Sequence, residues 1–322
     1  MMKKRHLIVD GSNLLHRILH VPTMRELRDK KGRFTGGTYG VLKSVRMTCE
    51  QFDINGACIV VWDTGHSPRR ISLLPEYKKT RKEKKVESMD DGTLFDYQSQ
   101  FIKQRATANA GLGLLGVRIA LLPDREADDI IAKLIGMLKS EIIIATEDKD
   151  FYQLISDRVK VWRPMLGKLM DKETFREDYE FSPRLWTFYR AMTGDASDGI
   201  AGVHGVGETT AKAVVQKMAR PDYGSLMTAI SVLSDSNKRV AKLVGEEEVL
   251  RRNLELIDLK RERFDWTEMR RLNTMIVGRT DPDLVKFADW SAKFDLQSIL
   301  DYLVQWIETF RRLGGVDASS MA

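Results

Sequence analysis

The stretch Glu-Ile-Ile-Ile-Ala-Thr-Glu-Asp-Lys-Asp, residues 141–150, decides the fold, because an apolar run leads directly into a group of acids. A short, nearly continuous apolar run is typical of a strand buried on both faces of a parallel sheet. The predicted strands are His6–Asp10, Cys58–Asp63, Val117–Leu122, Glu141–Thr146 and a weaker Val159–Trp162. Segments with a helical pattern, near residues 37–51, 93–115 and 126–139, lie between them. Strands that alternate with helices predict an α/β fold with a doubly wound parallel sheet.

Acidic residues end or follow four of these strands, and two more follow a predicted helix in the segment MTGDASDG, residues 192–199. The nine acids are Asp10, Asp63, Glu126, Asp128, Asp129, Asp148, Asp150, Asp195 and Asp198. The carboxyl ends of parallel strands meet at one edge of the sheet, where such folds bind ligands, so we expect the nine to converge on one crevice. Carboxylates packed this closely repel one another unless a cation lies among them. Hard divalent cations with oxygen ligands, Mg²⁺ or Mn²⁺, are therefore the predicted occupants.

Charge and composition narrow the function further. The chain of 322 residues carries 52 Lys and Arg against 46 Asp and Glu, and the surface outside the nine acids is more basic still. A basic surface around an acidic pocket suits an enzyme that grips phosphates and cuts one, and two divalent ions roughly 3.5–4 Å apart activate water for that reaction. The apolar runs are far shorter than the roughly 18 residues that span a bilayer, and the N-terminus does not read as a secretory signal. We expect no membrane association, a cytoplasmic location, and buried thiols at Cys49 and Cys58.

A basic segment between Arg69 and Lys85 follows the strand that ends at Asp63. At the mouth of the proposed crevice its cations would attract a phosphate backbone, and Tyr77 would stack on a base. The residues assigned to backbone binding are Arg69, Arg70, Lys79 and Lys82. The alternative interpretation is a solvated, charged loop.

A glycine-rich turn in GIAGVHGVGETTAKAVV, residues 199–215, leads into a predicted helix. Backbone N–H groups at such a helix start point outward and bind phosphate. The candidate residues are Gly202, Gly205, Gly207, Thr209, Thr210 and Lys212. The alternative is a corner between two helices in which the glycines permit close packing.

Six motifs occur in an order that resembles the structure-specific 5′ nucleases: flap endonucleases, the 5′ nuclease domain of bacterial DNA polymerase I and the phage ribonuclease H enzymes. The motifs are VDGSNLLHR (9–17), VVWD (60–63), PEYKKTR (75–81), EADD (126–129), DKDFYQL (148–154) and GDASDGIAGVHGVGETTAK (194–212). The resemblance implies a PIN-like nuclease domain over residues 1–180, with a basic arch segment near 69–92. It implies a helical duplex-binding region over 181–322 that contains a helix–turn–helix variant.

The same resemblance assigns roles to residues. Asp10, Asp63, Glu126, Asp128 and Asp129 match the carboxylates around a first metal ion, and Asp148, Asp150, Asp195 and Asp198 match those around a second. Tyr77, Lys78 and Arg81 fall at the foot of a helical arch, where Lys78 and Arg81 would neutralise the scissile phosphate. The glycine turn resembles the helix–turn–helix variant that grips a duplex backbone, with K⁺ as a candidate ion on its main-chain carbonyls.

The implied activity is that of a 5′-3′ exonuclease and flap endonuclease with RNase H-like removal of RNA primers in DNA replication. The expected cofactors are two Mg²⁺ ions, for which Mn²⁺ can substitute. The expected partners are DNA and RNA–DNA duplexes with 5′ ends or flaps, together with replication proteins. We expect a monomer, located in the host cytoplasm if the chain is encoded by a phage.

Other classes remain open. A Toprim site needs Glu where the first strand ends in Asp10, and a haloacid-dehalogenase-type phosphatase needs Asp-x-Asp where the chain has Asp10-Gly11-Ser12. A single-domain PIN ribonuclease explains the acids but neither the basic segment nor the glycine turn. A DNA-binding module without catalysis would use both and leave the acids solvated.

Overall fold

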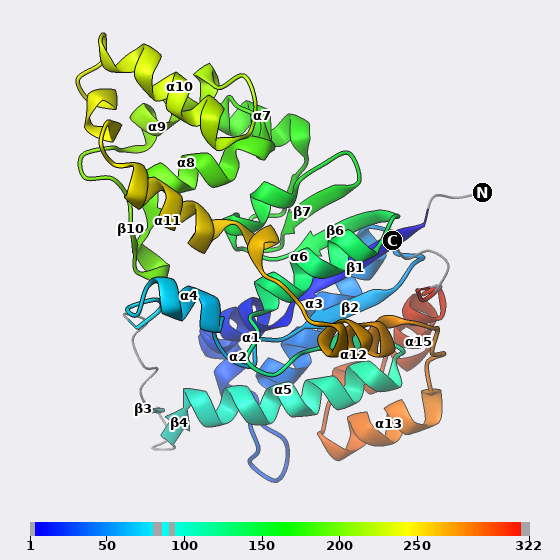
Figure 1. Cartoon of the computed structure of the whole chain (residues 1–322). Coiled ribbons are helices and arrows are strands. Elements are labelled where there is room, and N and C mark those ends of the chain that lie inside the picture. The colour runs from blue at the N-terminus through cyan, green and yellow to red at the C-terminus, as the bar shows by residue number, and fades with distance from the viewer. Residues whose placement is uncertain (1–3, 80–85, 90–93, 317–322) are drawn as a thin grey trace. The chain divides into compact units, whose positions relative to one another are not determined.

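The computed structural model describes residues 4–79, 86–89 and 94–316, which divide into two compact units (Figure 1). Of the described residues, the first unit contains 4–65, 86–89, 94–147 and 264–316. The second contains 66–79 and 148–263. The domain limits at residue 180, inferred from the sequence, remain a prediction.

The first unit begins with the strand β1 and ends with a group of helices from the C-terminal part of the chain. Its strands are β1 (Arg5–Asp10), β2 (Cys58–Val61), β3 (Val86–Ser88), β4 (Leu94–Asp96), β5 (Arg118–Ala120) and β6 (Glu141–Ala145). Its helices are α1 (Gly11–Leu19), α2 (Pro22–Glu26), α3 (Gly36–Gln51), α5 (Tyr97–Leu114), α6 (Ala127–Met137), α12 (Trp266–Ile276), α13 (Leu284–Lys293), α14 (Gln297–Leu300) and α15 (Leu303–Arg311).

Four parallel strands, in the order β5-β2-β1-β6, form the core of this unit. Val9 pairs with Val60 of β2 on one side and with Ala145 of β6 on the other, so that β1 is a central strand. Every residue of β2 and β6 is buried, as expected of strands covered on both faces. The predicted parallel sheet is thus confirmed for its four main strands, and all of their carboxyl ends lie at one edge.

Helices cover this sheet in two groups. Helices α1, α3 and α5 pack on one another, and α1 also contacts β1 and β2. Helix α6 packs on β1 and β2, whereas α12 packs along β5. The two cysteines, Cys49 on α3 and Cys58 on β2, are buried free thiols, as predicted.

The second unit is mostly helical and contains two small antiparallel strand pairs. Its strands are β7 (Val159–Arg163), β8 (Lys168–Met170), β9 (Gly194–Asp195) and β10 (Ile200–Ala201). Its α-helices are α4 (Pro68–Leu73), α7 (Lys172–Tyr179), α8 (Trp186–Thr193), α9 (Glu208–Lys217), α10 (Tyr223–Ser234) and α11 (Glu247–Ile257). Its 3₁₀ helices are η1 (Lys149–Leu154), η2 (Pro183–Leu185), η3 (Ala196–Asp198), η4 (Val240–Leu243) and η5 (Leu259–Arg261).

The core of the second unit holds α8 in a fixed position. Trp186 packs edge-on against Phe175 and Tyr152, and all three side chains are buried. On its other side α8 packs on α11, where the buried Asn253 Nδ2 donates to the carbonyl oxygens of Ala191 and Ala201. Asn253 therefore fixes the two ends of the segment that carries Asp195 and Asp198.

In three segments the structure adds detail that the sequence pattern did not supply. The weak fifth strand is present as β7, but it pairs antiparallel with β8, which the sequence pattern did not indicate. The apolar spacing of three and four over residues 296–313 predicts helix, and the structure has two helices there, α14 and α15, separated at Asp301 and Tyr302 without a glycine or proline to mark the break. The segment 274–295, whose apolar residues follow no single period, contains the end of α12 and the whole of α13.

Among the described residues, none of the helices has both the length and the apolar character needed to span a membrane.

Candidate metal centre

Asp10 lies at the carboxyl edge of the parallel sheet in the first unit and is 4% exposed. Its Oδ1 accepts the backbone N–H of Asn13 and so caps α1, while its Oδ2 accepts the hydroxyl of Thr146, just after β6, at 3.0 Å. The next residue, Gly11, is required because a β-carbon there would meet Val60 and Trp62 at 2.8–2.9 Å. The sequence Asp-Gly-Ser-Asn therefore turns directly from β1 into α1 and holds the carboxylate at the edge.

Asp63 connects the next strand end to α6. Its backbone N–H donates to the hydroxyl of Ser12, and its Oδ1 accepts the N–H of Ala127, the first residue of α6, at 2.7 Å. Glu126, which directly precedes α6, is 1% exposed, and Asp129 in its first turn is fully buried. Asp128 is half-buried. The first unit thus positions all five of the carboxylates assigned to a first metal ion near the ends of β1 and β2 and the start of α6.

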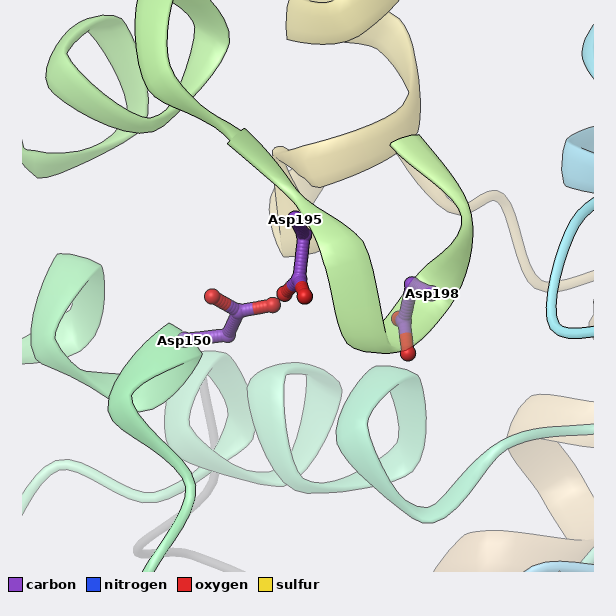
Figure 2. A group of neighbouring side chains, drawn as sticks. All are labelled: Asp150, Asp195 and Asp198. Atoms are coloured by element: carbon purple, nitrogen blue, oxygen red, sulfur yellow. The ribbon is translucent and has the colours of Figure 1, made fainter. Parts of the chain in front are cut away.

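The second unit brings three carboxylates together. One oxygen from each of Asp150, Asp195 and Asp198 lies within 4.8 Å of the others, and Figure 2 shows the three side chains. Asp148 belongs to the same segment as Asp150. The backbone N–H of Asp150 donates to Asp148 Oδ1 at 2.8 Å. The turn that carries Asp195 depends on Gly194, which has φ +77° and whose added β-carbon would collide with Gly202 and Ile200.

Arg190 of α8 is the cation of this group, and the sequence analysis missed it. It forms ion pairs with Asp195 Oδ2 and with Asp150 Oδ1, the latter at 3.4 Å. It lies on α8, just ahead of the MTGD motif, and this spacing of about one helical turn from Asp195 is the signal that could have revealed it.

Burial and neighbouring charges shift the pKa values of these acids in different directions. Burial, followed by the charge of Asp148, raises the pKa of Asp150 well above its ordinary value against the opposing effect of Arg190. Burial also raises the pKa of Asp148, together with the charges of Asp198 and Asp195. Burial acts in the same direction on Asp195, but Arg190 and the hydrogen bonds from Ser197 outweigh it and lower the pKa of Asp195. In the metal-free protein the charged form is therefore favoured at Asp195 and disfavoured at Asp148 and Asp150.

The residues of this cluster fit a hard divalent cation. The donors are carboxylate oxygens, which Mg²⁺ and Mn²⁺ prefer. Asp150 Oδ1 is buried and accepts no hydrogen bond from any described residue; its contact with Arg190 Nε is an ion pair at 3.4 Å, so the oxygen keeps hydrogen-bonding capacity for a ligand. That all nine carboxylates of the chain converge on one crevice remains a prediction.

Tyr77 and Lys78 lie against the same cluster within the second unit. The Tyr77 hydroxyl donates to Asp198 Oδ2 at 3.3 Å, and Lys78 Nζ lies 3.7 Å from the same oxygen. Both side chains are buried, and the Tyr77 ring packs with Ile200 and Leu256. Their expected roles at the reacting phosphate remain predictions.

The other basic residues of this segment mostly serve contacts inside the protein. Arg70 is 1% exposed and donates to the carbonyl oxygen of Leu256. Arg69 donates to Glu262 at 2.8 Å, and Lys79 forms an exposed pair with Glu76. Arg81 and Lys82 lie outside the described residues. Backbone binding by any of these residues remains a prediction, and for Arg69 and Arg70 it would require the present contacts to open.

The glycine turn is present, and α9 begins at Glu208 as predicted. Gly205, Gly207 and Thr209 are exposed, whereas Thr210 is buried and Lys212 pairs with Glu180 at 2.6 Å. Gly202 lies against the main chain of Thr193, where a side chain would not fit. This glycine therefore permits close packing of the main chain, whether or not it also binds phosphate. Lys242 lies next to Gly205 and adds a cation to the turn. The sequence pattern did not indicate this cation, because Lys242 is far from the turn along the chain.

Comparison with known proteins decides the family. Residues 5–180 match the family model described as the 5′-3′ exonuclease N-terminal resolvase-like domain. The chain belongs to this 5′-3′ exonuclease family.

Individual members of the family agree with this assignment. The chain is 34% identical over 227 residues to the thermostable DNA polymerase I of Thermus aquaticus, a match that covers 70% of this chain and 24% of the polymerase. It is 27% identical over 216 residues to the 5′-3′ exonuclease of Buchnera aphidicola, covering 66% of this chain and 70% of that protein. The chain therefore spans about a quarter of the polymerase and most of the stand-alone exonuclease.

A solved structure shares the fold. The flap endonuclease D15 of bacteriophage T5, in a pseudo-enzyme–product complex with DNA and metal ions, superposes with a TM-score of 0.64 at 21% sequence identity. The match covers 96% of this chain and 99% of that one. The resemblance drawn from the six motifs is thus confirmed, and so is the α/β fold class.

Proposed function

We propose that this 5′-3′ exonuclease family member hydrolyses phosphodiesters at 5′ ends and 5′ flaps by a two-metal-ion mechanism. The observation that carries the proposal is the group Asp150, Asp195 and Asp198, because three convergent carboxylates, one of them with a buried oxygen that accepts no hydrogen bond, suit a divalent cation. The five carboxylates at the sheet edge of the first unit, assigned above to the first metal ion, supply the candidates for the other ion.

The proposed substrates are DNA duplexes with 5′ ends or flaps and RNA–DNA duplexes, and the proposed role is primer removal in DNA replication. The T5 structure with DNA and metal ions, and a second T5 structure with divalent zinc ions bound, support nucleic acid and divalent cations as ligands. Mg²⁺ is the proposed ion, with Mn²⁺ as its substitute and K⁺ at the glycine turn. We also propose that the protein is a monomer, that it is located in the cytoplasm and that it acts with replication proteins.

Divalent ions, when bound, activate water and stabilise the leaving oxygen of the phosphodiester. Asp148, Asp150, Asp195 and Asp198 would hold one of them. Lys78 would give up its contact with Asp198 and neutralise the reacting phosphate. The turn at Gly205, with Lys242 beside it, would hold the duplex backbone through N–H groups and a cation.

The test is cleavage of a labelled duplex with a 5′ flap in the presence of Mg²⁺. We expect cutting by the full chain, loss of cutting in a chelator, and recovery when Mg²⁺ or Mn²⁺ is added back. Cutting that a chelator leaves unchanged would overturn the two-metal mechanism. Tight binding to the flap without any cutting would instead favour a DNA-binding module.

A further inference from the structure

Trp266, the first residue of α12, is the most exposed large apolar side chain in the described part of the chain, at 73%. The guanidinium of Arg270, one turn later, lies 5.4 Å from the centre of its ring. Exposure of this much apolar surface to water costs free energy, and an exposed indole beside a guanidinium is suited to stack on a planar partner.

The outer face of α12 is basic and polar. Thr267, Arg270, Arg271 and Asn273 are exposed on it, and within the described residues neither arginine forms an ion pair. The acid on this helix, Glu268, is already engaged: Arg125 Nε and Nη2 donate to its two carboxylate oxygens at 2.7 and 2.9 Å. The two arginines therefore remain available for an external anion.

The same ion pair locates Trp266 within the first unit. Arg125 immediately precedes Glu126 in the loop after β5, so its bond to Glu268 fixes the start of α12 beside that loop. At the other end of α12, Gly278 lies next to Arg118 at the start of β5. Helix α12 consequently runs antiparallel to β5, and its exposed tryptophan lies at the edge of the sheet where the carboxylates gather.

We infer that this face of α12 binds a single strand of nucleic acid, with a base stacked on Trp266 and neighbouring phosphates on Arg270 and Arg271. A single indole surrounded by guanidinium groups and polar side chains matches the stacking and charge that single strands require. A protein partner would call for a contiguous apolar patch, and the rest of this face is polar. The inference extends the proposed function, because a strand held here would lead to the carboxylates of the first unit.

The test measures binding of a fluorescent oligo(dT) to the full chain in EDTA, where no cleavage occurs. We expect Trp266→Ala to weaken binding roughly 5- to 100-fold, the range for loss of one base–aromatic stack, and Trp266→Phe to retain most of the affinity. Arg270→Ala should lower the slope of log affinity against log salt by about 0.7, the value for one phosphate of a single strand. Tyr302→Ala is the matched control, because Tyr302 is also exposed, at 56%, but follows Asp301 in place of a cation.

Intrinsic fluorescence supplies a second readout. Addition of oligo(dT) should quench the emission of the wild-type chain, and the quenched part should disappear in Trp266→Phe. If Trp266→Ala binds oligo(dT) as tightly as the Tyr302→Ala control, the inference is wrong, and the face then serves another partner or none.

A parallel cleavage assay separates this inference from the proposed function. Cutting of a 5′-flap duplex by a chain whose oligo(dT) affinity does not depend on Trp266 would overturn the stacking surface alone. Binding that depends on Trp266 in a chain that cuts no substrate would overturn the nuclease proposal and support the surface.

Discussion

Lys78 and Asp198 are joined twice: the backbone N–H of Lys78 donates to the carbonyl oxygen of Asp198 at 2.9 Å, and Lys78 Nζ lies 3.7 Å from Asp198 Oδ2. The lysine takes a left-handed backbone conformation, with φ +57°, to do so. A lysine held in this way lies beside a candidate metal ligand before any substrate arrives.

We therefore expect Lys78→Met to slow cleavage of a 5′-flap duplex about a hundredfold at saturating substrate, with a much smaller change in affinity. The reason is that a cation placed at the reacting phosphate stabilises charge mainly in the transition state. Single-turnover rates and binding in Ca²⁺ measure the two quantities separately. Lys172→Ala, which removes an ion pair with Asp157, is the control and should cut normally. Equal losses of rate and affinity would reduce Lys78 to a backbone contact.

Asp195→Asn should abolish cutting while duplex binding persists. One carboxylate of the group of three becomes neutral, which weakens the hold on a divalent ion and costs several kcal/mol of transition-state stabilisation, about a hundredfold or more in rate. Calorimetric titration with Mn²⁺ should show a parallel loss of affinity. Asp178→Asn, which changes an exposed pair with Lys168, should leave both quantities unchanged. Undiminished cutting by Asp195→Asn would remove this residue from the metal site.

Removal of the cation at Arg190 should destabilise the metal-free protein. Arg190→Met removes the cation that pairs with both Asp150 and Asp195, and we expect a loss of about 1–3 kcal/mol in the free energy of unfolding, less than for a fully buried pair because Arg190 is partly exposed. Mn²⁺ should raise the melting temperature of this variant more than that of the wild type, because the ion replaces the missing charge. An equal shift in both proteins would argue that Arg190 does not balance this cluster.

The pH dependence of stability should separate Asp150 from Asp195. Burial raises the pKa of Asp150 in the folded state, so the folded protein binds an additional proton, and stability falls as the pH rises from about 4 through this raised pKa. In EDTA, Asp150→Asn should therefore stabilise the protein at about pH 7.5, and the gain should shrink toward about pH 4.

Asp195 has the opposite sign, since its pKa is lowered when the protein folds. Its contribution to stability is present above the ordinary carboxyl range and is lost as the pH falls through its lowered pKa. Asp195→Asn should accordingly destabilise the metal-free protein at about pH 7.5. Urea unfolding at several pH values measures both variants, and the same sign for both would contradict the charge balance described here.

Two glycines of the turn should differ in their response to substitution. Gly205 has φ +73° and adjoins Lys242, so Gly205→Ala strains the backbone by about 1–2 kcal/mol and displaces that cation. We expect weaker duplex binding, measured by anisotropy. No atom lies within 4 Å of a β-carbon placed on Gly207, whose φ is ordinary, so Gly207→Ala is the matched control. A Gly205→Ala variant that binds the duplex as tightly as the wild type would dissociate the turn from the duplex.

How much the sequence determined by itself can be seen at β1 and β6. Their unbroken apolar runs predicted strands buried on both faces, and the position of Asp10 immediately after one run predicted a carboxylate at the sheet edge. These inferences succeed because apolar periodicity and strand ends are local properties of the chain. The order of the six motifs along the chain likewise indicates the family from the sequence alone.

Only the tertiary structure decided which charges meet. Arg190 and Lys78 come from segments far apart in the sequence, yet each contacts an acid of the Asp150, Asp195 and Asp198 group. Trp266 could equally have been a core residue by its pattern, and its exposure depends on how α12 lies along β5. The pairs of Lys78 with Asp198 and of Arg190 with Asp150 join segments that are distant in the sequence, so no local pattern encodes them. The sequence thus determines the strands and the acids at their ends, and the packing of the helices determines which cations balance those acids.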